Sequence, residues 1–164
     1  MHQDITPHTD ASELRIGIAI SRYHSEITDR LLESAMEYFT SQGGHPDNLL
    51  VVPTPGAFEL TVVCRAFSEI DNLDAALALG CVIAGETTHD QYINQSITQG
   101  LTSITLETGL PIGFGVLTCQ SLEQARARAG GKIGNQGEEA MAAAIEITNT
   151  LLMLSEVEGG FLSQ

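Results

Sequence analysis

A turn at residues 85–89, Gly-Glu-Thr-Thr-His, combines residue types that can bind an anion and move a proton. It follows an apolar run at 75–83 that predicts a buried strand, and apolar residues at helical spacing come after it. The first turn of a helix has backbone N–H groups without intrahelical acceptors, so such a junction can hold an anion. The imidazole of His89 can transfer protons near neutral pH. Taken alone, however, the stretch favours an ordinary strand-to-helix connection with a solvated His89.

A second feature is a cluster of positive charge in a strongly acidic chain. The net charge is −14, yet three of the seven Lys and Arg residues, Arg126, Arg128 and Lys132, lie together beside four glycines. A small bound anion would explain the cluster. Cations that complement the dipole at a helix C-terminus would explain it equally well. The residues alone leave these two interpretations even.

The composition restricts the partners and the compartment. A net charge of −14 argues against binding to nucleic acid or to an anionic membrane surface. We expect no apolar run long enough to span a bilayer, and the N-terminus does not resemble a signal peptide. Cys64, Cys81 and Cys119 lie far apart within apolar runs, without metal-ligand spacing. They predict reduced core thiols in a cytoplasmic protein.

The elements that must position these residues alternate between strand and helix. Apolar runs predict strands at 14–20, 48–53, 75–83 and 112–117. Helical patterns end near 43 and 109, and others cover 122–129 and 138–154. A further helix is expected to open at Pro55 and to be largely buried, with Phe58, Val62, Val63, Ala66 and Phe67. The alternation predicts a parallel sheet with helices on both faces.

The length and apolar content, 164 residues and 43%, suit one compact domain. We expect an N-terminal extension at 1–13, extended or mobile, one domain at 14–154, and a frayed tail at 155–164. Ligands of parallel sheets bind beyond the carboxyl ends of the strands. The loops expected there are 22–24, 55–59, 85–89 and 118–121, and polar and aromatic residues converge in them. The sequence therefore predicts the ligand site at these loops.

Four segments also resemble one enzyme family. These are PGAFEL at 55–60, VIAGETTH at 82–89, FGVLT at 114–118 and EQARARAG at 123–130. Together, in this order and at this spacing, they are similar to lumazine synthases over roughly 14–154. Four such segments are a specific match, whereas any one would be weak.

The resemblance implies a fold and a reaction. The fold would be a three-layer, flavodoxin-like α-β-α sandwich with a four-stranded parallel sheet. The reaction would condense 5-amino-6-(D-ribitylamino)uracil with 3,4-dihydroxy-2-butanone 4-phosphate, giving 6,7-dimethyl-8-ribityllumazine, phosphate and water in riboflavin biosynthesis. No cofactor and no metal would be required. Because both substrates are already reactive, much of the acceleration would come from holding them together.

The resemblance also assigns roles by position. His89 would transfer protons. Tyr23 would stack on the pyrimidine, and Phe114 would pack on it from a neighbouring subunit. The other substrate-binding positions would be Ala57, Phe58, Glu59, Val82 and Ile83. The phosphate would be bound by Gly85, Glu86, Thr87 and Arg128. The anion-binding turn and the arginine cluster thus fall on one ligand group, which decides both open questions in favour of a bound anion.

Several positions depart from the family pattern. Tyr23 replaces Phe or Trp, which preserves stacking. His24 replaces a frequent Asn, so a ribityl contact there is open. Ala84 replaces a common Arg, and Asp90-Gln91 replace an aromatic and an acidic residue, so the carboxylate partner of His89 is missing or displaced to Asp90. Gln136 replaces a frequent Lys, which leaves the phosphate mainly to Arg128 and backbone donors.

The family forms homopentamers that can close into icosahedral shells of sixty subunits, with riboflavin synthase as a candidate partner. The uninterrupted turn Gly131-Lys132-Ile133-Gly134-Asn135 favours the shell. Two alternatives from other classes are a non-catalytic flavin- or lumazine-binding relative and a shell-forming relative with a vestigial site. Both are disfavoured because His89, Arg128, Phe58, Phe114 and Glu59 are all present. A response-regulator-like domain would need an acidic cluster at the strand ends that the sequence lacks.

Overall fold

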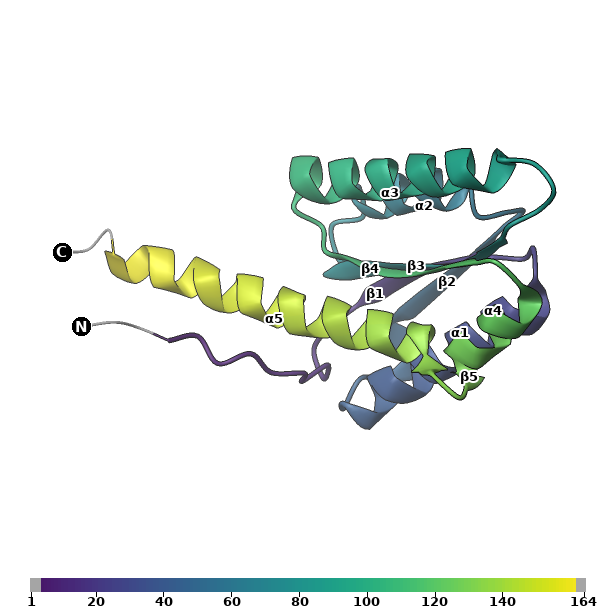
Figure 1. The fold of residues 1–164 in the computed structure, drawn as a ribbon. Helices are drawn as coiled ribbons and strands as arrows, with labels where there is room; N and C mark the ends of the chain where they lie inside the picture. The colour runs from purple at the N-terminus through teal and green to yellow at the C-terminus, as the bar shows by residue number, and fades with distance from the viewer. Residues whose placement is uncertain (1–3, 162–164) are drawn as a thin grey trace.

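One parallel sheet forms the centre of the molecule (Figure 1). The computed structural model describes residues 4–161. The strands β1 (Ile16–Ser21), β2 (Leu49–Thr54), β3 (Ala75–Ile83) and β4 (Ile112–Cys119) have the order β2-β1-β3-β4. All neighbouring strands are parallel, so their carboxyl ends share one edge of the sheet. The predicted four-stranded parallel sheet is confirmed.

Helices cover both faces of this sheet, as the alternating pattern predicted. Figure 1 shows α2 (Leu60–Phe67) and α3 (His89–Thr108) on one face. On the other face lie α1 (Ser25–Ser41), α4 (Leu122–Arg128) and α5 (Gln136–Phe161). A 3₁₀ turn at Pro46–Asn48 precedes β2, and a small hairpin, β5 (Ala129–Gly131) and β6 (Gly134–Asn135), joins α4 to α5. The layers form the expected α-β-α sandwich.

The strand β3 lies between two apolar cores, one on each face of the sheet. Its first eight residues are buried, because one side of the strand packs toward α1 and α5 and the other toward α2 and α3. Burial on both faces explains why its sequence is continuously apolar instead of alternating. The edge strand β2 is different: Leu50 and Val51 are exposed, and it contains Pro53, which an edge strand tolerates.

The helix α2 begins later and buries a different face than predicted. It starts at Leu60, whereas residues 55–59 form a turn. Its buried residues are Leu60, Cys64 and Phe67, while Phe58 and Val62 are 58% and 66% exposed. The expectation of a largely buried helix from Pro55 was therefore wrong. Phe58 and Val62, which were predicted to be buried, lie on the outer surface of the single chain.

The helix α5 is longer than predicted. It continues to Phe161, so residues 156–161 are helical instead of frayed, and residues 162–164 lie outside the described part. Met141, Ala144, Ile145 and Thr148 are buried as expected, but Leu152 is half exposed. Contrary to expectation, Gln136–Val157 is long and apolar enough to cross a membrane, the one such stretch among residues 4–161. Because its inner face packs in the apolar core with α1, we assign it as a core helix.

The N-terminal segment is extended along α5, as Figure 1 shows. The Asn149 side-chain amide donates to the carbonyl oxygens of His8 and Asp10, at 3.2 and 2.9 Å. Ala11 is buried, and its N–H donates to the Gln42 carbonyl at 2.9 Å. Residues 8–11 are thus fixed by hydrogen bonds, which agrees with an extended segment. Residues 1–3 lie outside the described part.

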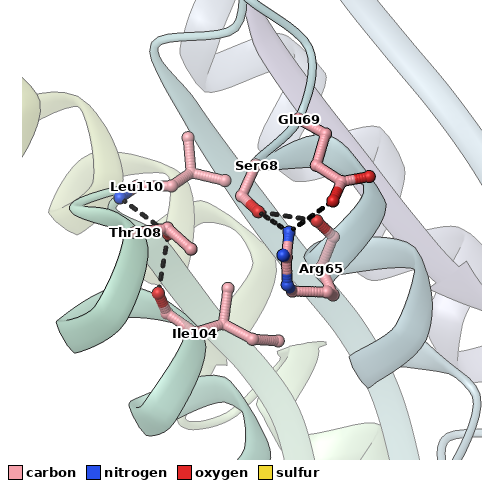
Figure 2. A network of polar contacts seen from close by, with 6 residues as sticks. All are labelled: Arg65, Ser68, Glu69, Ile104, Thr108 and Leu110. Carbon is pink, nitrogen blue, oxygen red and sulfur yellow. Dashed lines mark hydrogen bonds and ion pairs between the residues drawn. The ribbon is translucent and has the colours of Figure 1, made fainter.

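The carboxyl-terminal ends of α2 and α3 are closed by local polar contacts (Figure 2). The Arg65 guanidinium donates to the Ser68 hydroxyl at 2.8 Å and pairs with Glu69 at 3.1 Å. In α3, the Thr108 hydroxyl donates to the Ile104 carbonyl and accepts from the Leu110 N–H. Gly109 ends the helix with φ of 76°, a conformation that glycine adopts without steric cost. These contacts fix the carboxyl-terminal ends of both helices. These ends lie far from the loops at the carboxyl ends of the strands.

Candidate active site

A cavity of about 720 Å³ lies at the carboxyl ends of β1, β2 and β3. This is the edge of the sheet where parallel α/β folds bind ligands, and the volume is that of a small-molecule site. Loops after three different strands contribute to it. Its lining residues are Tyr23, His24, Gly56, Ala57, Phe58, Glu59, Cys81, Val82, Ile83, Gly85, Thr87, His89, Asp90, Tyr92 and Ile93.

The loop after β1 presents two rings to the cavity. Tyr23 is 66% exposed, and its ring lies edge-on to the ring of His24, with centroids 4.6 Å apart and an interplanar angle of 75°. His24 precedes the first residue of α1 and has φ of 59°. Tyr23 therefore offers an open aromatic face on which a planar ligand can stack.

The turn after β2 carries Ala57, Phe58 and Glu59. The Thr54 hydroxyl donates to the Gly56 carbonyl at 2.8 Å, which ties the turn to the end of β2. Glu59 is the N-cap of α2 but makes no side-chain capping bond. Its carboxylate instead folds over Gly56, where an added Cβ would lie 3.1 Å from a Glu59 carboxylate oxygen. The carboxylate is thereby available to the cavity.

The turn after β3 leaves backbone donors without protein acceptors. The Ala84 N–H donates to the Cys119 carbonyl at 2.8 Å, which ties the start of the turn to the end of β4. The N–H groups of Gly85, Glu86 and Thr87 donate to no acceptor among residues 4–161. Consecutive free N–H groups before the N-terminus of α3 are a favourable place for a bound anion.

His89 is the first residue of α3 and lines the same cavity. Within the described chain its imidazole has no hydrogen-bond or ion-pair partner, and the neighbouring Asp90 also lines the cavity without contacting it. An imidazole without a protein partner can accept a proton from a bound substrate and can donate one to it.

The thiol of Cys81 also lines the cavity, and burial raises its pKa to about 12. Cys81 is therefore a neutral wall residue and no nucleophile.

Two predicted site residues lie away from this cavity. Phe114 is paired in register with Ala78, in the middle of the sheet, and is 41% exposed in a groove between α3 and β4. Arg128 is exposed at the end of α4. Phe114 lies five residues before the end of β4, about 16 Å at the usual rise of a strand. A single chain therefore does not bring Phe114 to the other predicted residues. Burial raises the pKa of Cys119 at the end of β4 and the charge of Arg128 opposes this rise, but Arg128 does not line their cavity.

The arginine cluster divides in the structure. Arg126 pairs with Glu26, with 3.3 Å between Nη2 and Oε2, and has a structural partner. Arg128 and Lys132 form no ion pair with any residue from 4 to 157. Within this cluster, positive charge without an ion-pair partner is therefore confined to Arg128 and Lys132. Glu86, the remaining predicted position, is exposed in the turn but does not line the cavity.

Sequence reasoning did not assign site roles to several lining residues. Tyr92 and Ile93 follow His89 at spacings of three and four residues, so they share its helix face. From this spacing, Tyr92 and Ile93 could have been predicted as lining residues once His89 was placed in the site. Gly56 and Cys81 line the cavity because they adjoin predicted residues, and Asp90, expected only as a displaced carboxylate partner of His89, also lines it. Among residues 4–161, no group of three His, Cys, Asp or Glu side chains could hold a metal ion.

Comparison with known proteins assigns the family. The model of the family described as 6,7-dimethyl-8-ribityllumazine synthase matches residues 13–151. A protein of that name from Thermus thermophilus is 42% identical over 151 residues, which cover 92% of this chain and 96% of that protein. One from Parabacteroides distasonis is 40% identical over 146 residues, covering 89% of this chain and 91% of that protein. One from Lawsonia intracellularis is 38% identical over 151 residues. The chain therefore belongs to the 6,7-dimethyl-8-ribityllumazine synthase family.

Proposed function

We propose that this chain condenses 5-amino-6-(D-ribitylamino)uracil with 3,4-dihydroxy-2-butanone 4-phosphate to form 6,7-dimethyl-8-ribityllumazine. One observation carries the proposal beyond family membership. Nine of the twelve residues expected at the site from the family pattern line a single cavity at the strand ends. They are Tyr23, Ala57, Phe58, Glu59, Val82, Ile83, Gly85, Thr87 and His89.

The pyrimidine would bind against the loops after β1 and β2. Tyr23 supplies the face for stacking, and Val82 and Ile83 supply apolar walls. Backbone groups of Ala57 and Phe58 would exchange hydrogen bonds with the ribityl hydroxyls. The Glu59 carboxylate would accept hydrogen bonds from them. The folded-back position of Glu59 over Gly56 supports this role, because its carboxylate is not used by the helix.

The phosphate would bind at the turn after β3. The N–H groups of Gly85, Glu86 and Thr87 have no protein acceptors, and phosphate oxygens are strong acceptors. The guanidinium of Arg128 would pair with the same group. Holding the phosphate here places the rest of the butanone beside His89, and elimination would leave the phosphate on donors that suit its charge.

His89 would move the protons of the reaction. The uracil amine adds to the ketone, and loss of water requires a proton on the departing hydroxyl. Elimination of phosphate requires removal of a proton from the carbon next to the imine. Ring closure then releases a second water. A single imidazole at the cavity can accept and return these protons in turn, while the fixed substrates supply most of the rate gain.

We also infer that the site is completed by a second copy of the chain. Phe114 and Arg128 do not line the cavity of their own chain, but they expose an aromatic ring and a charge that has no ion-pair partner among residues 4–157. A homopentamer would bring these groups to the cavity of a neighbour, and the short hairpin at 131–135 supports closure to a shell of sixty copies. Riboflavin synthase, which consumes the product, is the proposed partner. The three free, buried thiols support a cytoplasmic location.

A direct assay tests the proposed function. The purified chain is incubated with both substrates, and formation of 6,7-dimethyl-8-ribityllumazine is followed by its fluorescence together with release of inorganic phosphate. We expect both products in equal amounts, without added metal or cofactor. Bound flavin or lumazine without turnover would indicate a binding protein. Neither turnover nor binding would contradict the proposal.

A further inference from the structure

The loop after β1 has a firmly anchored backbone. The Arg22 N–H donates to the Thr54 carbonyl at 2.9 Å, and the Thr28 hydroxyl donates to the Ser21 carbonyl at 2.7 Å. On the other side, the His24 carbonyl accepts from the N–H groups of Ile27 and Thr28 at 2.9 and 3.1 Å. Both flanks of Tyr23 are therefore fixed, and the remaining freedom of this residue is in its side chain.

The Tyr23 side chain is poorly held by the rest of the protein. It is 66% exposed, and its hydroxyl makes no hydrogen bond within residues 4–161. Its one aromatic contact in the described chain is the ring of His24, edge-on at 4.6 Å between centroids and 75° between planes. Edge-to-face pairs are an attractive geometry for aromatic rings. The His24 ring thus limits the orientations that Tyr23 can adopt.

His24 has an unusual backbone and no role as a helix cap. Among residues 4–161 it is the one residue other than glycine with positive φ, 59°. Asn and Asp adopt this conformation more readily than most residues, and Ser, Thr, Asn and Asp are the usual N-caps. His24 stands at the N-cap of α1 but makes no side-chain capping bond. The left-handed backbone directs the imidazole to Tyr23 and the cavity instead of to the helix.

We propose that His24 is a positioning residue that holds the ring of Tyr23 for stacking on the pyrimidine substrate. The inference rests on the proposed function and concerns one step of it, binding of the pyrimidine. His24 acts through Tyr23 and takes no part in proton transfer or in phosphate binding. It therefore affects the affinity for the pyrimidine, and not the affinity for the butanone phosphate or kcat at saturation.

The test measures pyrimidine binding in variants that keep the left-handed backbone. His24→Gly removes the ring, adds no polar side chain that could contact the ligand and suits positive φ, so folding is preserved. We expect its Kd for 6,7-dimethyl-8-ribityllumazine, measured by equilibrium dialysis, to rise about threefold to tenfold, the value of one edge-to-face contact. The KM for the butanone phosphate and kcat should stay within about twofold. His24→Phe restores a ring edge and should return the Kd to near the wild-type value.

A double-mutant cycle separates positioning from direct contact. In the Tyr23→Ala background, His24→Gly should cause no further rise in Kd, because the group that His24 positions is gone. Additive effects would show that His24 contacts the ligand itself and would overturn the inference, as would an unchanged Kd in the single variant. His45→Gly is the matched control, since His45 lies in the exposed turn before β2. If the wild-type chain binds the lumazine and converts both substrates, the proposed function stands. Additive effects in the cycle would then refute only the positioning role of His24.

Discussion

At the scale of the residue, His89 carries the chemistry of the proposed reaction. Its imidazole lines the cavity and has no hydrogen-bond or ion-pair partner among residues 4–157, so it is available to exchange protons with the substrate or with water. His89→Ala should lower kcat about a hundredfold, the low end of what general acid–base catalysis contributes, because proximity of the substrates survives. The KM values should change little. An unaltered kcat with an unaltered pH–rate profile would remove His89 from the mechanism.

The buried thiol of Cys64 makes a prediction about stability and pH. Burial raises its pKa from 9.0 to about 12 in the folded chain. In the unfolded chain the thiol ionises near its ordinary value, so between pH 9 and 12 the unfolded state loses a proton that the folded state keeps. The free energy of unfolding should therefore fall across this range and be unaffected by this thiol below pH 9.

The comparison variant for this prediction is Cys64→Ala. It is less stable at every pH because a small cavity replaces the sulfur, but its stability should fall less steeply between pH 9 and 12. Urea denaturation at a series of pH values gives both slopes. Equal slopes would mean that the Cys64 thiol is not excluded from solvent in the folded state.

At the scale of the element, the packing of α5 on α1 depends on a residue without a side chain. A Cβ at Gly137 would lie 2.0 Å from the backbone carbonyl oxygen of Leu31, which cannot rotate away. Gly137→Ala should lower the free energy of unfolding by about 3 kcal/mol, the upper end for overpacking. Gly85→Ala is the control, because nothing lies within 4 Å of its added Cβ. Equal stability of the two variants, measured by urea denaturation, would contradict the packing described.

The elements also show which parts of the fold are readable from sequence. The strand β3 and the helix α3 could be predicted to within a residue, because burial on both faces and a 3.6-residue repeat leave strong patterns. The start of α2 could not. Phe58 and Val62 are apolar, but they serve the cavity or the outer surface of the chain instead of the core. An apolar residue kept for a ligand or a partner has the same sequence signal as one kept for the core.

At the scale of the whole molecule, the predicted site is incomplete in one chain. Residues from three loops could be assigned together because the ends of parallel strands share one edge. Phe114 and Arg128 belong to the same set by family pattern, yet neither lines the cavity of its own chain. No pattern within one chain distinguishes contacts made within it from contacts made between copies. The exposed Val62, Leu106 and Phe114 are consistent with a surface that another copy covers.

The proposed sharing of the site between subunits makes a prediction about mixtures of two variants that are each inactive. His89→Ala and Arg128→Ala should each lose most activity as pure proteins, since every site then lacks one group. In a ring built by heterologous contacts, each interface pairs the cavity of one subunit with the β4 edge of the next. Some interfaces of a mixed ring combine an intact His89 with an intact Arg128 from its neighbour. With random mixing in equal amounts, these are about a quarter of the sites.

Co-expressed variants should therefore regain about a quarter of the wild-type activity. The measurement needs subunits that assemble together, because preformed rings or shells exchange subunits slowly. Native mass spectrometry establishes both the mixed composition and the number of subunits. Co-expression of His89→Ala with a second His89→Ala chain is the control and should recover nothing. Confirmed mixed assemblies without recovered activity would mean that each site lies within a single chain, with Arg128 outside it.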